Sequence, residues 1–172
     1  MKQPLAISAY LQQTYWWAYI HPNGVNLFER QWLVNLILWG NFFRLRNAAL
    51  NELGQSLPGR TLQIACVYGN FTPQLAKRVA LDGRLDVVDI LPIQLKNLRA
   101  KLPETAPVEL HRRDSTSLGF ADASYERVVV FFLLHEQPEA VRRQTVHEAL
   151  RVLKPGGKLV VVDYHQPRRL HP

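Results

Sequence analysis

From residue 58 onward, hydrophobic and polar positions form blocks that predict strands and helices in alternation. Short apolar runs typical of strands lie at 61–66, 85–88, 107–111, 127–132 and 158–162. Helices are predicted between them, from Thr72 and Pro73, from Pro92 to Lys101, and from Pro138 to Leu153. Residues 154–157 are expected to turn the chain into the last strand. This order predicts an α/β fold with a parallel sheet and right-handed crossovers.

The first 54 residues follow a different pattern and contain all four tryptophans. From about Val25 to Leu53, apolar residues recur at steps of three to four, which predicts a helix that ends before Gly54. The apolar run 32–39 is far shorter than the roughly 18 to 20 residues that a membrane span needs. Two interpretations stay open. The segment is a buried helix that covers one face of the domain, or an interfacial helix whose tryptophans and arginines meet lipid headgroups.

Composition restricts the classes of protein. A chain of 172 residues with 47% hydrophobic residues buries one core. The one cysteine, Cys66, excludes a disulfide framework and a thiolate metal cluster. The start of the chain has neither a secretory pattern nor the arginines of a mitochondrial presequence, so a cytoplasmic location is expected. The net charge of +7 is spread along the chain, which disfavours nucleic acid and favours an anionic membrane surface as the partner.

The segment 61–89 reads as strand, tight turn, helix and strand, with Asp89 closing the second strand. Asp89 follows Gly69 by 20 residues, a spacing typical of units that bind the adenosine half of a ligand. In such units the turn approaches the ligand and the carboxylate accepts hydrogen bonds from ribose hydroxyls. Where three glycines are usual, this turn has Ala65, Val67 and Gly69. The layout predicts a nucleoside ligand that is held in an unusual way.

Further motifs follow in the order seen in a large enzyme family. They are Asp114 after the third predicted strand, residues 122–130 around the fourth, and Leu153–Leu159 before the fifth. Together with Gly69 and Asp89, they make the segment 61–163 resemble the class I S-adenosylmethionine-dependent methyltransferases. The resemblance implies a Rossmann-like parallel sheet and S-adenosylmethionine as the cofactor. It also implies that the two C-terminal antiparallel strands of that fold are missing, so that 55–172 is a truncated cofactor-binding domain.

A narrower resemblance covers nearly the whole chain. The segments 16–22, 28–42, 65–71, 131–138 and 162–165 look like the rhodoquinone-biosynthesis branch of that superfamily. The branch implies conversion of ubiquinone to rhodoquinone, in which an amino group replaces a ring methoxy group. It further implies that S-adenosylmethionine supplies the amino group and that a divalent metal such as manganese assists. Ubiquinone in the bilayer would then be the partner, and the helical extension 1–54 would make a peripheral contact with the inner, quinone-containing membrane.

The resemblance assigns roles to residues of the predicted cofactor site. Asp89 would accept hydrogen bonds from both ribose hydroxyls, with a solvated loop acid as the alternative. Gly69 would admit the cofactor, with a plain turn glycine as the alternative. Asp114 and the Ser115 amide would bind the adenine amino group, unless Asp114 is an Asx-turn residue.

The methionine end of the cofactor would meet the turn after the first strand. Tyr68, as a catalytic residue, and Val67 would line this end. The side chains of Ala65 and Val67 stand where a methyltransferase keeps bare backbone. They would shift the amino-acid half of S-adenosylmethionine while its adenosine half stays on Asp89 and Asp114.

His135, Asp163 and His165 follow the fourth and fifth predicted strands, whose ends lie at the ligand-binding face of an open α/β sheet. An extended chain points Asp163 and His165 to the same side. With His135 they would offer nitrogen and oxygen ligands suited to manganese or a similar divalent ion. The ion would act as a Lewis acid at a quinone carbonyl. His135 is alternatively a general base, and all three are otherwise ordinary polar residues at strand ends.

Three functions therefore stay open. The leading prediction is a peripheral membrane enzyme that uses S-adenosylmethionine to aminate ubiquinone. The second is ordinary methyl transfer to a quinone or lipid, against which the replaced glycines speak. The third is a non-catalytic fragment that binds S-adenosylmethionine or a membrane without turnover, because truncation would leave the edge of the fifth strand uncovered.

Overall fold

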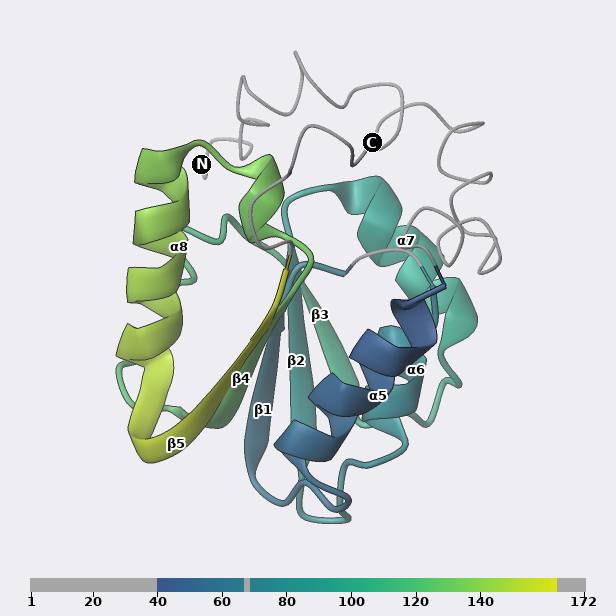
Figure 1. Cartoon of the computed structure of the whole chain (residues 1–172). Helices are drawn as coiled ribbons and strands as arrows, with labels where there is room; N and C mark the ends of the chain where they lie inside the picture. Colours follow the sequence, from purple (N-terminus) through teal and green to yellow (C-terminus); the bar gives the residue numbers. More distant parts are fainter. Residues whose placement is uncertain (1–39, 67–68, 164–172) are drawn as a thin grey trace, which may run out of the picture.

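The computed structural model describes residues 40–66 and 69–163, and predictions that concern the other residues lie outside it. Within these residues the chain forms a five-stranded sheet (Figure 1). Its strands are β1 (Arg60–Ile64), β2 (Arg84–Asp89), β3 (Val108–Arg112), β4 (Tyr125–Phe131) and β5 (Leu153–Val162). The helices are α5 (Phe42–Leu53), α6 (Phe71–Ala76), α7 (Pro92–Lys101) and α8 (Glu139–Val152), with a short 3₁₀ helix, η1, at Leu134–Glu136.

The strands lie in the order β3-β2-β1-β4-β5, and each neighbouring pair is parallel. β1 is central: Leu62 pairs with Asp86 of β2 on one side and with Val128 of β4 on the other. The chain builds one half of the sheet outward from β1 and then crosses over to build the other half from β4. This confirms the predicted Rossmann-like parallel sheet. It also places a crevice where the chain leaves β1 and β4 in opposite directions.

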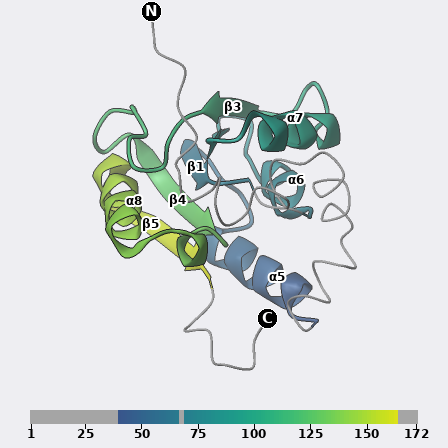
Figure 2. The ribbon, with the colours of Figure 1, turned by 90° about the horizontal axis from the view of Figure 1, so that it is seen from above.

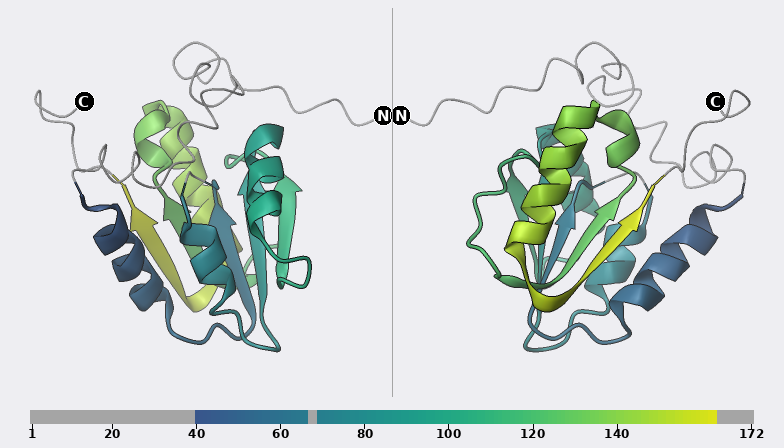
Figure 3. Two further views of the ribbon diagram at one scale, coloured as in Figure 1. Left: turned by 90° about the vertical axis from the view of Figure 1, so that its right-hand side faces the viewer. Right: turned by 60° about the vertical axis from the view of Figure 1, so that its left-hand side comes forward.

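Helices cover both faces of the sheet, with α5, α6 and α7 on one face and α8 on the other (Figure 2; Figure 3). Phe42 of α5 and Phe71 of α6 belong to the hydrophobic cluster on the first face. Ala149 and Val152 of α8 belong to the cluster on the second. Full burial of one large apolar side chain contributes roughly 1.5–3 kcal/mol, so these clusters hold the three layers together.

α5 is the C-terminal end of the helix predicted over 25–53. It ends where the sequence predicts, and the Gly54 amide donates to the Leu50 carbonyl at 3.1 Å. Phe42 is completely buried, whereas Phe43 is 39% exposed. Residues 42–53 therefore form a helix that covers one face of the domain, which is the first of the two interpretations. Residues 25–39 lie outside the described residues.

The predicted start of the helix after β1 is wrong by two residues. α6 begins at Phe71, whereas the sequence pattern places Thr72 before the helix and Pro73 first in it. Asn70 precedes the helix, but its side chain makes no capping bond. Its oxygen accepts a hydrogen bond from Arg46 Nη1 at 2.8 Å instead. A contact with α5 thus takes the polar side chain that would otherwise cap α6.

The last strand is longer than predicted. β5 begins at Leu153, directly after α8, rather than at Lys158. Leu153 pairs with Tyr125 and Lys158 with Arg127, with an irregularity in the register between them. Residues 154–157 therefore form a bulge inside the strand, with Gly156 at a φ of 76°.

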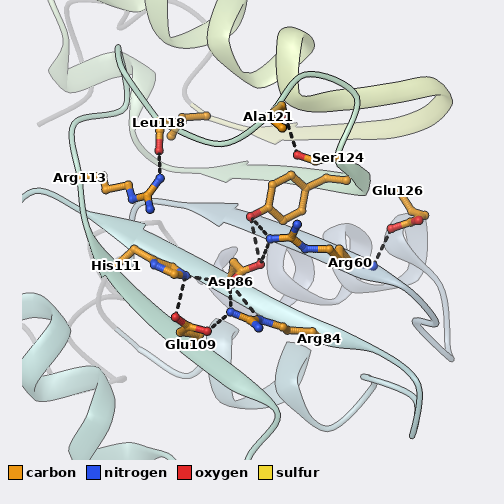
Figure 4. Close-up of polar contacts among 11 residues, drawn as sticks. Arg60, Arg84, Asp86, Glu109, His111, Arg113, Leu118, Ala121, Ser124 and Glu126 are labelled. Atoms are coloured by element: carbon orange, nitrogen blue, oxygen red, sulfur yellow. Dashed lines mark hydrogen bonds and ion pairs between the residues drawn. The ribbon is translucent and has the colours of Figure 1, made fainter.

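Asp86 of β2 is fully buried and is the centre of an ionic network (Figure 4). Its carboxylate contacts Arg60 at 3.0 Å, Arg84 at 3.2 Å and His111 at 2.8 Å. The Tyr125 hydroxyl donates to it at 3.0 Å. Burial raises the pKa of Asp86, but the hydrogen bonds from His111, Arg60 and Tyr125 bring it below its ordinary value. The network thus joins β1, β2, β3 and β4 through one charged group.

This network predicts a pH dependence of stability. The folded-state pKa of Asp86 is below its ordinary value of 3.8, so the unfolded chain takes up the proton first as the pH falls. The stabilising contribution is therefore present above that value and lost below it. We expect the free energy of unfolding to fall between about pH 5 and pH 3 more steeply in the wild type than in Asp86→Asn. Urea denaturation across this range measures the slope.

At neutral pH, Asp86→Asn should also lower the free energy of unfolding by about 2 kcal/mol, because charged hydrogen bonds are lost. Asp82→Asn, which removes an exposed carboxylate shortly before β2, is the control. Equal slopes for Asp86→Asn and the wild type would show that Asp86 does not cause the acid sensitivity.

Candidate functional site

A pocket opens at the carboxyl ends of β1 and β2 and in the turns after β3 and β4. It holds about 620 Å³ of empty space including its open mouth. Four of the predicted cofactor residues line it: Ala65, Asp89, Asp114 and Ser115. Crevices at this edge of an open α/β sheet are where such folds bind ligands. The structure therefore brings these four residues together in the expected place.

Two residues of the pocket wall have a left-handed backbone conformation. Ala65 follows β1 with a φ of 69°, and Phe132 follows β4 with a φ of 53°. This conformation costs a non-glycine residue about 1–2 kcal/mol, and residues held in it cluster at functional sites. The Ala65 amide donates to Val88 at 2.8 Å and the Phe132 amide to Val162 at 2.7 Å. Ala65 thus keeps a conformation that suits glycine while it adds a methyl group to the pocket wall.

The carboxylate of Asp89 bridges the ends of β1 and β2. Its Oδ2 accepts hydrogen bonds from the Cys66 amide at 2.9 Å and from Cys66 Sγ at 3.4 Å. Its Oδ1 accepts one from the Leu91 amide at 2.8 Å. Burial raises the pKa of Asp89, and the bonds from Leu91 and Cys66 offset part of the rise. Asp89 is therefore a partly buried bridge at the pocket, with its carboxylate bound to backbone amides rather than only to solvent.

The same burial controls the neighbouring thiol. Burial and the charge of Asp89 raise the pKa of Cys66 well above its ordinary value. The thiol is therefore protonated at neutral pH and can donate to Asp89. A buried, protonated thiol is a poor nucleophile, so we assign Cys66 no covalent chemistry.

Asp114 forms an Asx turn after β3. Its Oδ1 accepts hydrogen bonds from the Thr116 amide at 2.8 Å and from the Thr116 hydroxyl at 2.7 Å. The Ser117 amide donates to the Asp114 carbonyl at 3.1 Å. Asp114 thus has the geometry of an Asx-turn residue, which is the alternative to adenine binding that the sequence leaves open. It also lines the pocket.

Gly69 lies outside the pocket lining. Its φ is 92°, and a Cβ atom at this position would lie 2.6 Å from Cζ of Phe42. Its carbonyl accepts a hydrogen bond from Lys101 Nζ at 3.2 Å. The close approach that the missing side chain permits is therefore to the Phe42 ring.

His135 and Asp163 form a hydrogen-bonded pair beyond the ends of β4 and β5. His135 Nδ1 is 2.7 Å from Asp163 Oδ1. Asp163 Oδ2 accepts hydrogen bonds from the amides of Leu134 at 2.6 Å and His135 at 3.3 Å. The structure thus brings these two predicted residues into contact, with the carboxylate bound to the histidine itself. A carboxylate at Nδ1 fixes the tautomer and the orientation of an imidazole ring.

Another group of side chains comes close enough to share a cation. In the described part of the chain, ligand atoms of Asp86, Glu109 and His111 lie within 4.8 Å of one another. None of the three lines the pocket. Arg84 contacts both carboxylates, and Arg60 contacts Asp86. Because these arginines already balance the negative charge, we assign the group a structural role.

Three predicted site residues, Val67, Tyr68 and His165, lie outside the described residues. The structure adds pocket residues to which the sequence assigned no role, namely Gln94 and three residues of the segment 131–138: Phe132, Glu136 and Gln137. A signal exists for Gln94. It stands between Leu91 and Leu98 at helical spacing on the buried face of α7, where a polar residue is unusual.

The architecture of the sheet and its pocket defines a class of protein. A parallel sheet with a pocket at its switch point and an acid at the end of β2 is typical of α/β domains that bind nucleosides and nucleotides. Within that class, the methyltransferase domain family matches residues 61–157. The chain belongs to this family.

Two curated relatives carry quinone names. A ubiquinone/menaquinone biosynthesis C-methyltransferase of Ectopseudomonas mendocina is 32% identical over 139 residues, which cover 78% of this chain and 54% of that protein. A demethylmenaquinone methyltransferase of Staphylococcus saprophyticus is 27% identical over 135 residues, covering 78% and 57%. The chain therefore spans about half the length of the curated relatives that it matches.

Solved structures support the fold. A SAM-dependent methyltransferase from Aquifex aeolicus has a TM-score of 0.59 at 21% identity, over 74% of this chain and 68% of that one. The N-methyltransferase NodS from Bradyrhizobium japonicum, in complex with S-adenosyl-L-homocysteine, has a TM-score of 0.56 at 21% identity, over 85% and 64%. At such identities the similarity concerns the fold, and it confirms the predicted methyltransferase type.

The backbone conformation of Ala65 predicts a stabilising substitution. Ala65→Gly removes Cβ from a left-handed residue and should raise the free energy of unfolding by about 1 kcal/mol. Ala123→Gly is the matched control, because Ala123 has a φ of 48° and lies outside the pocket lining. Chemical denaturation should show a similar gain for both variants. A loss of stability in Ala65→Gly alone would mean that packing of the methyl group outweighs the strain.

Proposed function

We propose that the chain binds S-adenosylmethionine in this pocket and forms part of a transferase that acts on a membrane quinone. The observation that carries the proposal is the meeting of Ala65, Asp89 and Asp114 in one switch-point pocket. NodS, a protein of similar fold, is solved with S-adenosyl-L-homocysteine. Two relatives are quinone methyltransferases by name. These similarities support the ligand and the substrate class.

In this proposal the adenosine half of the ligand lies on Asp89. The ribose hydroxyls donate to its carboxylate, and they replace the contact from Cys66 Sγ, which at 3.4 Å is the longest hydrogen bond to Asp89. Val67 and Tyr68 line the methionine end. The methyl group of Ala65 shifts the amino-acid half away from the end of β1.

Among quinones we propose ubiquinone as the substrate and rhodoquinone as the product. The ring carbon would lose its methoxy group as methanol and bond to the α-amino nitrogen of S-adenosylmethionine. The N–Cα bond of the donor must then break: the quinone ring would take up the electron pair as an imine forms at Cα, and water would hydrolyse the imine to release the aminoquinol and an α-keto acid. Two of the segments that resemble rhodoquinone biosynthesis, 65–71 and 131–138, both contribute residues to the pocket wall. Ala65 adds a methyl group to this wall. The added methyl group supports a position of S-adenosylmethionine that differs from its position in a methyltransferase.

We assign His135 as the catalytic base or metal ligand and Asp163 as its positioning residue. In this assignment Asp163 accepts a hydrogen bond from the Nδ1–H group of His135, which leaves Nε2 as the acceptor atom of the ring. The same arrangement suits a metal-bound histidine, whose second nitrogen usually donates to a carboxylate. A divalent ion such as manganese fits here together with a further ligand, for which we propose His165. When bound, the ion would polarise a quinone carbonyl.

A long-tailed quinone lies in the bilayer, so we propose peripheral contact with the cytoplasmic face of the quinone-containing membrane. Across 40–66 and 69–163, none of the helices is both long and apolar enough to cross a bilayer. Phe43 is 39% exposed, and the Arg46 guanidinium lies 5.0 Å from its ring centre. An exposed aromatic ring with an arginine beside it suits anionic headgroups, which supports contact through residues 15–43.

Ordinary methyl transfer to a quinone is the second candidate, and the names of the relatives favour it. It needs the same cofactor and the same class of substrate, but the transferred group is methyl. Because the chain spans about half the length of those relatives, binding without turnover is the third.

Mass spectrometry of the quinone distinguishes these candidates. The full chain is incubated with S-adenosylmethionine, a short-tailed ubiquinone and manganese. The proposal expects a product in which one methoxy group is replaced by an amino group, and none when S-adenosylmethionine is omitted. A methylated quinone would instead establish the second candidate. An unchanged quinone, with S-adenosylhomocysteine binding intact by calorimetry, would establish binding without turnover.

Asp163→Asn tests the positioning of His135. Loss of the carboxylate leaves the imidazole unoriented, and we expect turnover to fall roughly 10–100-fold. Cofactor affinity should stay unchanged, since neither residue lines the pocket. Glu139→Gln, which removes an exposed carboxylate on α8, is the control. An equal fall in cofactor affinity would show that the pair shapes the pocket instead.

A further inference from the structure

Two glutamines of the pocket wall have buried polar atoms without partners. Gln94 is 4% exposed and Gln137 is 3% exposed, and both line the pocket. Within the described residues, Gln94 Nε2 and Gln137 Oε1 have no hydrogen-bond partner. Buried polar atoms in native proteins are nearly always hydrogen-bonded, so each exception needs an explanation. A ligand that offers one acceptor and one donor would explain both.

The surroundings of each glutamine determine which atom it can offer. Gln94 belongs to the first turn of α7, and its backbone N–H donates to the Leu91 carbonyl at 3.1 Å. This bond does not involve the side-chain amide. Gln137 Nε2 donates to Ser115 Oγ at 3.0 Å, and Ser115 Oγ is 2.9 Å from Thr145 Oγ1 of α8. Because Ser115 occupies the amide nitrogen of Gln137, the remaining atom is the carbonyl oxygen, which is an acceptor.

An unpartnered atom alone does not identify a site. Thr61 Oγ1, Gln63 Oε1 and Asn97 Nδ2 are also buried without partners in the part of the chain that the structure describes, yet these residues do not line the pocket. Gln94 and Gln137 differ because they share one pocket with Asp89. They come from different elements of the chain, Gln94 from α7 and Gln137 from the segment between η1 and α8.

We infer that Gln94 and Gln137 are specificity-determining residues that bind the adenine base of S-adenosylmethionine, an inference that rests on the proposed function. Gln137 Oε1 accepts a hydrogen bond from the exocyclic amino group, and Gln94 Nε2 donates to N3 or N7 of the ring system. Adenine offers both an amino donor and nitrogen acceptors on its edges.

This assignment moves recognition of the amino group from Asp114 to Gln137. Asp114 Oδ1 already accepts two hydrogen bonds from Thr116. Gln137 is bound to Ser115, the next residue after Asp114, so the two positions are neighbours. Gln137 Oε1 is buried and has no partner, whereas Asp114 is only partly buried and water can reach its carboxylate, so the amino donor gains more from Gln137.

Isothermal titration calorimetry of the full chain with two product analogues tests the inference. S-Adenosylhomocysteine carries the amino group, whereas S-inosylhomocysteine has a carbonyl oxygen there and a proton on N1, and it keeps the N3 and N7 acceptors. The wild type should bind the adenosyl compound about tenfold more tightly. Gln137→Leu should lose about tenfold in that affinity and with it the preference. Gln94→Leu should weaken both ligands by a similar factor and keep the preference.

Asn97→Leu is the matched control, because Asn97 lies on α7 with an unpartnered amide nitrogen outside the pocket lining. It should leave both affinities unchanged. Gln137→Met, with an unbranched side chain of similar length, should repeat the result of Gln137→Leu, and thermal unfolding identifies any variant that misfolds. If both Gln137 variants keep the preference for the adenosyl compound, the inference is wrong. If the wild type binds neither analogue, the proposed function is wrong and the inference fails with it.

Discussion

The carboxylate of Asp89 holds together the two chain segments that form the floor of the pocket. It accepts amide hydrogen bonds from Cys66, just after β1, and from Leu91, just before α7. A buried carboxylate costs free energy unless donors surround it, and backbone amides provide donors that lose no side-chain entropy. The bridge therefore sets the path of both segments. The bridge made by Asp89 thereby positions Ala65 and Gln94 at the pocket.

The sheet could be predicted because each strand has a strong local pattern. The apolar runs at 61–66, 85–88 and 127–132 fall within two residues of the observed β1, β2 and β4. The boundaries differ where a distant contact decides them. Asn70 is bound to Arg46 of α5 instead of capping α6, and residues 154–157 bulge within a strand that pairs with β4. Such contacts join residues far apart in the sequence, so no local pattern contains them.

The site could be predicted as far as topology alone determines it. Asp89 and Asp114 follow neighbouring parallel strands, whose carboxyl ends share one edge of the sheet. The hydrogen-bond partner of each polar atom at this edge could not be predicted, because it depends on side-chain rotamers and on neighbouring residues. Asp163 is bound to His135, and Asp114 is occupied by its own turn. Gln137 lies in the segment 131–138 of the narrower resemblance, but the sequence assigns it no role, and only its burial beside an open pocket gives it a chemical meaning.

Phe42 connects the N-terminal segment to the turn after β1. It is the first residue of α5 and is completely buried, and its ring fills the space that a side chain at Gly69 would need. The segment 15–43 proposed for the membrane includes this residue. A displacement of the Phe42 ring would therefore be transmitted to Gly69, which it contacts so closely that no side chain fits between them. The end of the proposed membrane segment and the turn after β1 thus meet at a single aromatic side chain.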